Sequence, residues 1–238
     1  MIIRAAILPH PPLLVPELVG NVRTRTEPVR TACVTAAARL AAAAPDWVAV
    51  AADPAGPVTL PAGARGSFAG YGVDVPVTLD PTREVAPDPL LPLPALVAGW
   101  LREQAGARRV TVHLVPPDLP PDDCRQVGAD IAAGPEPVGL LVLADGASRH
   151  TGAAARPDSR AVGFDAGVAA ALTGPDPAAL LSIDPGLAAE LGAQGRAAWQ
   201  VLAGAALAVG GQWSADLLYS DQPFGVAYHV AVWDPGST

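Results

Sequence analysis

Three short apolar runs, each followed at once by a turn, constrain the fold of this chain more than any other feature of its sequence. They span Ile2–Leu8, Trp47–Ala52 and Val138–Ala144 and consist mostly of branched or small apolar residues. Such runs are typical of strands buried on both faces of a parallel sheet. Because helical patterns lie between them, we expect an α/β protein, a three-layer α/β/α sandwich around a mixed, mostly parallel sheet.

The remaining segments continue this alternation. We expect Thr26 to cap a helix that runs to about Ala44, with Pro28 in its first turn. Further helices are expected at 94–105, 122–133 and 161–172 and in a broken region over 176–209, and further strands at 109–115, 215–219 and 224–233. A short turn joins the last two strands, so we expect them to pair antiparallel. No repeat or linker divides the chain, which predicts one domain over residues 1–238.

Composition and charge exclude several classes of protein. The net charge is −8, all 15 basic residues are arginine, and they never cluster beyond the pair Arg108-Arg109, so nucleic acid is not expected as a partner. No stretch of about 18 apolar residues is free of charge, proline and glycine, which argues against a membrane span. Neither Cys33 nor Cys124 lies in a Cys-x-x-Cys pair. We therefore expect reduced thiols, no secretory leader and a cytoplasmic location.

The polar residues that follow the three apolar runs are the first candidates for a site. His10, Asp53 and Asp145 come directly after the runs, and ligands of open α/β sheets bind beyond the carboxyl ends of the strands. A neutral imidazole such as His10 is a good metal ligand and a base near pH 7, and Asp53 could bind the metal or orient His10. Alternatively, His10 bonds only its own loop, and Asp53 forms an Asx-turn before Pro54.

A second group of candidates lies further along the chain. The segment Asp145–His150 combines a carboxylate, a hydroxyl, a guanidinium and an imidazole, so we predict Asp145 and His150 as catalytic acid–base groups, although Asp-Gly is also a common turn pair. Asp221 is a candidate carboxylate ligand, or only a turn former. We expect His229, in the last strand, to be a hydrogen-bonded core histidine rather than a ligand.

Several familiar motifs are absent from the sequence. It contains no Gly-x-Gly-x-x-Gly, no Gly-Lys-Ser/Thr phosphate loop, no Gly-x-Ser-x-Gly elbow and no His-x-x-x-His pair. The absence of these motifs argues against dinucleotide-binding, phosphate-loop and serine-hydrolase functions.

Three segments resemble a known family. Ala6–Leu14 (AILPHPPLL), Ala144–Gly146 and Tyr219–Tyr228 (YSDQPFGVAY) are similar to segments of class III extradiol ring-cleavage dioxygenases, the protocatechuate 4,5-dioxygenase catalytic-subunit type with its Memo-like relatives. The resemblance follows nearly the whole chain in order and is strongest to small actinobacterial members of unassigned activity. It implies the α/β fold predicted above.

The resemblance also implies a degenerate metal site. These enzymes hold a non-haem Fe(II) with two histidines and a carboxylate and use a further histidine as acid–base. His10 matches the first histidine, but Ala55 stands where the second is expected, with Asp53 one position away. Ala144-Asp145 matches the pair before the acid–base histidine, whereas His150 comes several residues later than expected. Asp221 is the remaining candidate ligand.

Two hypotheses follow. In the first, the chain keeps the fold and pocket, lacks the full Fe(II) site and binds a small molecule or a partner. In the second, it is an active dioxygenase or hydrolase with Fe(II) or another divalent metal, acting on a small aromatic or acidic substrate. A homodimer is also possible, with Trp213 and Trp233 as interface anchors.

Overall fold

The sheet is the centre of the molecule. The computed structural model describes all residues except 21–22, 151–155 and 237–238, and its main sheet has the strand order β3-β6-β2-β7-β1-β9-β8. Strands β6, β2, β7 and β1 are parallel, while β3, β9 and β8 pair antiparallel with their neighbours. The strands are β1 (Ile2–Leu8), β2 (Asp46–Ala52), β3 (Val58–Thr59), β6 (Arg109–Val115), β7 (Val138–Leu143), β8 (Trp213–Asp221) and β9 (Tyr228–Pro235).

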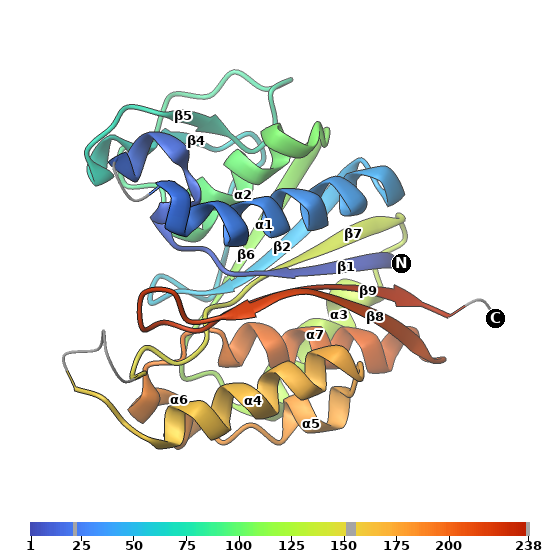
Figure 1. Ribbon diagram of the computed structural model, residues 1–238. Helices are drawn as coiled ribbons and strands as arrows, with labels where there is room; N and C mark the ends of the chain where they lie inside the picture. The colour runs from blue at the N-terminus through green and yellow to red at the C-terminus, as the bar shows by residue number, and fades with distance from the viewer. Residues whose placement is uncertain (21–22, 151–155, 237–238) are drawn as a thin grey trace.

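Helices cover both faces of this sheet, which confirms the expected α/β/α sandwich (Figure 1). One face carries α1 (Arg23–Ala43) and α2 (Leu93–Ala105). The other face carries α3 (Pro121–Ala132), α4 (Arg160–Thr173), α5 (Pro177–Leu181), α6 (Pro185–Leu191) and α7 (Arg196–Val209). A small hairpin of β4 (Arg65–Ser67) and β5 (Pro76–Thr78) and the short helices η1 (Pro12–Leu14), η2 (Pro16–Leu18) and η4 (Phe68–Tyr71) complete the described elements.

Successive side chains along each strand point to opposite faces of the sheet and so contribute to two separate cores. In β1, Ala6 and Leu8 belong to the core under α1 and α2, whereas Ala5 and Ile7 belong to the core against α7. All four are completely buried. Because a strand side chain points to the face opposite its neighbour's, most residues of a central strand must be apolar or small, and in β1 Arg4 is the exception.

Two glycines bring α3 and α7 into close contact. A Cβ on Gly128 would lie 2.1 Å from the carbonyl oxygen of Val201, and one on Gly204 would lie 2.2 Å from that of Arg125. Neither position has room for a side chain, so the spacing of these two helices depends on both glycines.

The structure corrects two predictions. Helix α1 begins at Arg23, so Thr26 does not cap it, and Pro28 lies inside it. The apolar face that packs on the sheet, including the fully buried Val29 and Cys33, stabilises the helix on both sides of this proline.

Of the two predicted interface anchors, Trp233 lies in the core and Trp213 packs against it. Trp233 is completely buried and its indole N–H donates to the carbonyl oxygen of Leu172 at 2.8 Å. The ring of Trp213, half-buried, packs on it with a centroid distance of 6.2 Å. Trp233 therefore has no surface to offer a partner, whereas Trp213 is partly exposed, and a homodimer stays a prediction. Among the described residues, no helix is long and apolar enough to cross a membrane.

Candidate functional site

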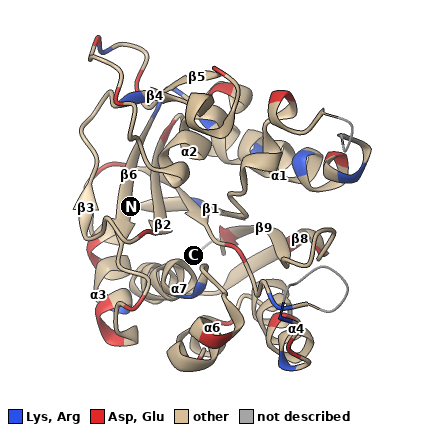
Figure 2. Ribbon diagram, turned by 90° about the vertical axis from the view of Figure 1, so that its left-hand side faces the viewer, with Lys and Arg blue, Asp and Glu red and all other residues tan. Residues whose placement is uncertain are grey.

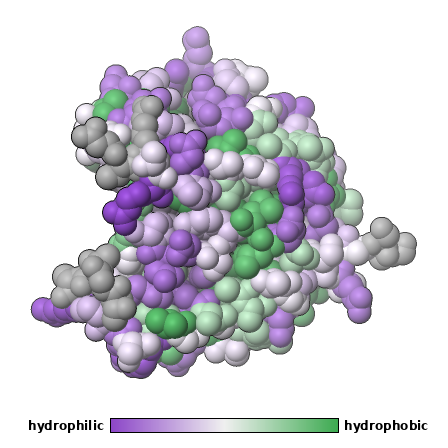
Figure 3. Space-filling model, viewed as in Figure 1, coloured by the Kyte–Doolittle hydropathy of each residue, from purple (hydrophilic) through white to green (hydrophobic). Residues whose placement is uncertain are grey.

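The carboxyl ends of β2, β7 and β1 lie side by side at one edge of the sheet. Leu143 in β7 is level with Leu8 in β1 and with Ala51 in β2. His10, Asp53 and Asp145 follow these ends and therefore leave the sheet at the same edge, as the sequence predicts. In Figure 3 this edge lies at the left, where hydrophilic residues gather and the outline of the molecule is hollowed.

His10 and Asp145 are in direct contact. The backbone N–H of His10 donates to Oδ1 of Asp145 at 2.8 Å, and the imidazole Nδ1 of His10 lies 3.7 Å from the same oxygen. The second distance is too long for a hydrogen bond. His10 is only 3% exposed, and its Nδ1 has no hydrogen-bond partner among the residues that the structure describes. Buried polar atoms are nearly always hydrogen-bonded to protein, ordered water or a ligand, so this nitrogen is a candidate contact atom.

A phenol and a thiol share the surroundings of Asp145. Burial, reinforced by the negative charge of Asp145, raises the pKa of Tyr228. The same two causes raise the pKa of Cys33, in α1, well above its usual value. Both groups therefore stay protonated near neutral pH, and the phenol of Tyr228 is available as a hydrogen-bond donor.

An apolar pocket of about 340 Å³ begins two residues after His10. The guanidinium of Arg25 lies 4.6 Å from the centroid of the Phe224 ring, which lines this pocket, and donates to the carbonyl oxygen of Pro223. An apolar pocket beside a few buried polar groups is the usual form of a small-molecule site. Its walls are Pro12, Leu13, Leu18, Val19, Thr26, Tyr71 and Phe224.

Asp53 forms a turn rather than a contact with His10. Its Oδ1 accepts the N–H of Ala55 at 2.8 Å, and its carbonyl oxygen accepts the N–H of Gly56 at 2.9 Å. This is the Asx-turn that the Asp-Pro pair favours. None of the contacts of the described residues joins the Asp53 side chain to His10, and the exposed Ala55 carries only a methyl group.

His150 is paired with a carboxylate that sequence reasoning missed. Its Nε2 lies 2.6 Å from Oδ2 of Asp165, and the N–H of Ala147 donates to Oδ1 of the same group at 3.1 Å. Asp165 belongs to α4 and is 5% exposed. One signal was available, because Asp165 is a lone carboxylate inside the apolar segment 161–172, and a buried carboxylate is almost always paired.

His229 completes this second cluster. Its Nδ1 lies 2.9 Å from Oγ of Ser220, and its Nε2 lies 3.5 Å from Oδ1 of Asp165. The expectation of a buried histidine holds, since it is 2% exposed, but its Nε2 makes no hydrogen bond to the described part of the chain. Ser220, His229, Asp165 and His150 therefore lie in a row at the carboxyl edge, on the face covered by α4 and α7, with hydrogen bonds from Ser220 to His229 and between His150 and Asp165.

Asp221 points elsewhere. It ends β8, is exposed, and its Oδ1 accepts the N–H of Gln222 at 2.7 Å. Burial, with a smaller contribution from Asp221, raises the pKa of Tyr219 to about 12. No described contact brings Asp221 to His10 or Asp145, so its role as a ligand stays a prediction.

The side chains present do not fit an Fe(II) facial triad. Such a site needs three converging ligand atoms. His10 and Asp145 offer two side chains, Asp53 is held in its turn, and Ala55 has no ligand atom. Across the described ranges, no group of three histidine, cysteine, aspartate or glutamate side chains is arranged to hold a metal ion.

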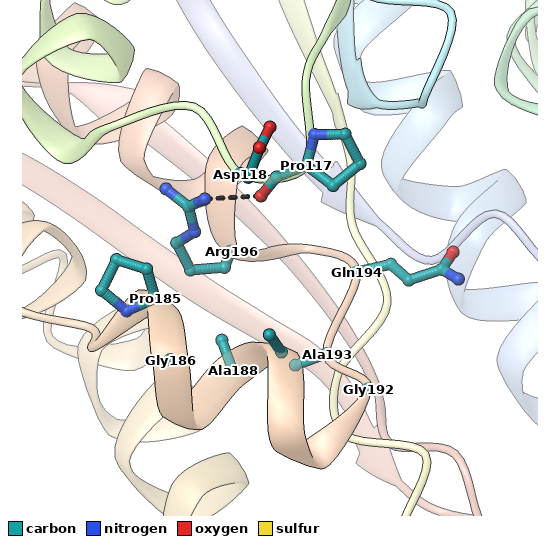
Figure 4. Close-up of a pocket in the computed structure, with 10 residues that line it drawn as sticks. Pro117, Asp118, Pro185, Gly186, Ala188, Gly192, Ala193, Gln194 and Arg196 are labelled. Atoms are coloured by element: carbon teal, nitrogen blue, oxygen red, sulfur yellow. Dashed lines mark hydrogen bonds between the residues drawn. The ribbon is translucent and has the colours of Figure 1, made fainter.

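A larger cavity of about 490 Å³ lies beside the end of β6, between the loop at Pro117 and α6 (Figure 4). Arg196, 3% exposed, donates there to the carbonyl oxygens of Pro117 and Leu119 and to Oε1 of Gln200. These bonds tie the loop after β6 to α7. Figure 4 shows the side chain of Gln194 turned away from Arg196, and small residues form most of the remaining wall.

The arrangement of charges agrees with the composition. Figure 2 shows acidic and basic residues dispersed over the helices and loops, with no broad basic surface on the side in view. Several arginines pair with carboxylates, as in the contacts of Arg108 and Arg109 with Asp46.

Comparison with known proteins adds one finding. No family model matches the chain, and no curated protein does. Among solved structures, the uncharacterized protein JW3007 from Escherichia coli K12 is similar, with a TM-score of 0.51 and 16% sequence identity over 98% of this chain and 100% of that one. At this identity the likeness concerns the fold alone, so the chain shares a full-length α/β architecture with that protein.

Proposed function

We propose that this chain is a class III extradiol dioxygenase-like protein that lacks a complete Fe(II) site and binds a small aromatic ligand at the carboxyl edge of its sheet. The observation that carries the proposal is the buried Nδ1 of His10, which has no hydrogen-bond partner among the described residues and precedes by two positions the first residue that lines an apolar pocket. A ligand with a hydroxyl or carbonyl group would satisfy this nitrogen and bury its ring in the pocket.

The chemistry of the pocket favours a planar ligand over a flexible polar one. Tyr71 and Phe224 contribute ring faces or edges to its wall, and aromatic rings pack well on one another. The protonated phenol of Tyr228, close to Asp145, supplies a further donor at the polar end. A phenol such as catechol combines a flat apolar body with hydroxyls that can both donate and accept.

The test is a binding titration on untagged protein. We expect calorimetry to detect catechol or protocatechuate, and His10→Ala to weaken the binding at least tenfold. His113→Ala is the matched control, because this histidine lies in β6, bonds Thr59 at 2.9 Å and takes no part in the pocket. Leu18→Trp, which fills the pocket, should also abolish binding and serves if His10→Ala does not fold.

Metal analysis separates the two hypotheses. We expect no stoichiometric uptake of Fe(II) under anaerobic conditions. One equivalent of Fe(II) bound by the wild type and lost in His10→Ala would overturn the proposal in favour of an active metal-dependent dioxygenase or hydrolase. Failure of all phenols to bind the folded protein would overturn it altogether.

A further inference from the structure

The exposed hydroxyl of Ser220 contacts the buried imidazole of His229, and the other side of this imidazole faces the buried carboxylate of Asp165. Ser220 Oγ lies 2.9 Å from Nδ1 of His229, whose Nε2 lies 3.5 Å from Oδ1 of Asp165. We propose that these three residues form a nucleophilic centre that hydrolyses small, uncharged carboxylic esters. None of its three residues lines the apolar pocket that begins at Pro12.

The sheet itself sets this geometry. Strands β8 and β9 pair antiparallel with Ser220 directly opposite His229, so the two side chains stand next to each other on the same face. The turn after β8 places both at the carboxyl edge. Asp165 reaches His229 from α4, which packs over β8 and β9 on that face.

Asp165 is in a position to select the tautomer of His229. A carboxylate that faces Nε2 favours the imidazole with its proton on that atom, which leaves the lone pair of Nδ1 free to accept the Ser220 O–H. The gap of 3.5 Å is longer than a hydrogen bond, as catalytic contacts often are before substrate binds. The N–H of Ala147 and the imidazole of His150 hold the carboxylate in place.

The arrangement does not depend on a sequence motif. Residues 218–222 contain no nucleophile elbow, but catalytic triads are recognised by geometry and by the role of each group. Since β8 is an edge strand, it leaves backbone N–H groups on its outer side without a neighbouring strand. Donors of this kind can stabilise the oxyanion of an acyl-transfer intermediate.

The proposed reaction balances without a further cofactor. Oγ of Ser220 forms a bond to the ester carbonyl carbon while its proton passes to Nδ1 of His229. The bond from that carbon to the alkoxy oxygen then breaks, and the alkoxide leaves with the proton from His229. Water, activated by the same imidazole, attacks the acyl-serine, releases the carboxylic acid and restores the Ser220 hydroxyl.

The surroundings select the class of substrate. The exposed carboxylate of Asp221 adjoins Ser220, and the protein carries a net charge of −8, so anionic esters are repelled. Ser220 itself is exposed, which gives a small ester direct access to its hydroxyl. Neutral acyl esters with a good leaving group are the best match.

The decisive experiment measures hydrolysis of p-nitrophenyl acetate and labelling by a fluorophosphonate, with the modified residue located by mass spectrometry. We expect label on Ser220 and at least a tenfold loss of labelling and hydrolysis in Ser220→Ala and in His229→Gln. Ser214→Ala is the matched control, since this exposed serine lies on the same strand, away from any histidine, and should keep its rates within twofold. A wild type whose Ser220 takes no label, or a Ser220→Ala variant with unchanged rates, overturns the proposal.

Asp165 is a positioning residue and needs a separate readout. We expect the ¹⁵N chemical shifts of the His229 ring to report the Nε2–H tautomer in the wild type and a shift toward Nδ1–H in a folded Asp165→Asn variant, with slower labelling. An unchanged tautomer in a variant that has lost labelling would assign Asp165 a structural role only and overturn its place in the centre.

Discussion

Nε2 of His150 lies 2.6 Å from Oδ2 of Asp165, and both side chains are buried. The pair joins α4 to the segment that follows β7, and Asp165 also accepts the N–H of Ala147. Removing one partner of such a pair leaves the other buried without compensation, which costs far more than the pair itself contributes. Asp165 should therefore be the most sensitive carboxylate for stability at this edge.

Asp165→Ala should lower the free energy of unfolding by about 3 kcal/mol, because it leaves His150 and the Ala147 N–H buried without their hydrogen-bond partner. Urea unfolding at pH 7 measures this change. Asp130→Ala is the control, since Asp130 is exposed and accepts a hydrogen bond from the neighbouring helical residue Gln126, and its loss should cost less than about 0.5 kcal/mol. Equal losses in the two variants would contradict the buried pair.

Gly146→Ala should be destabilising by about 2 kcal/mol, as expected for overpacking at a site without room. A Cβ there would lie 2.5 Å from Oδ1 of Asp165 and 2.8 Å from Cβ of Ala227. Gly163→Ala offers a contrast, because nothing lies within 4 Å of its Cβ and the exposed position is inside α4. This second change should stabilise the protein by up to about 1 kcal/mol, the helix preference of alanine over glycine. Thermal unfolding of the two variants should therefore shift in opposite directions.

Much of the fold could be predicted because the strands are buried on both faces. The run Ile2–Leu8 and the alternating Arg109–Val115 match β1 and β6 residue for residue. The start of α1 could not be read in the same way, because Thr26 and Pro28 carry strong local signals for a helix start. Packing of the apolar face of α1 on the sheet overrides those signals, and this packing is a property of the whole fold.

The candidate site was predictable only in part. His10 and Asp145 each directly follow a strand of the parallel sheet. Because the carboxyl ends of parallel strands lie at one edge of the sheet, the sequence identifies the two residues as neighbours. The partner of His150 could not be found by that reasoning, since Asp165 comes from a helix that crosses to this edge. The contact between Ser220 and His229 depends on the register of β8 and β9, and that register includes a bulge between Leu217 and Tyr219. A bulge changes which side chains share a face, so alternation along the sequence alone misplaces them.

Neither cysteine should react with a disulfide reagent such as DTNB in the folded protein at pH 8. Burial raises the pKa of Cys124 to about 11, against a smaller opposing effect of Arg196, and burial with the charge of Asp145 raises the pKa of Cys33 well above its usual value. The thiolate is the reactive form, and almost none is present at this pH. Two thiols per chain should react in urea, and none should react without it. In the Cys124→Ser variant, one thiol per chain should react in urea. Rapid release of one equivalent from the native protein would contradict the burial of these groups.

The stability that Asp46 contributes should disappear in acid. Hydrogen bonds from Arg108, with the charge of Arg109, lower the pKa of Asp46 in the folded protein. A carboxyl whose pKa is lower when folded adds stability above its unfolded pKa of about 4, and this stability is lost as the pH falls through the folded value. Both arginines are largely exposed, so the contribution is at most about 1 kcal/mol. Urea unfolding of wild type and Asp46→Asn should therefore differ at pH 7 and converge below about pH 3. Arg108→Gln should remove most of the difference at pH 7, and a gap between wild type and Asp46→Asn that widens in acid would show that the pKa shift has the opposite sign.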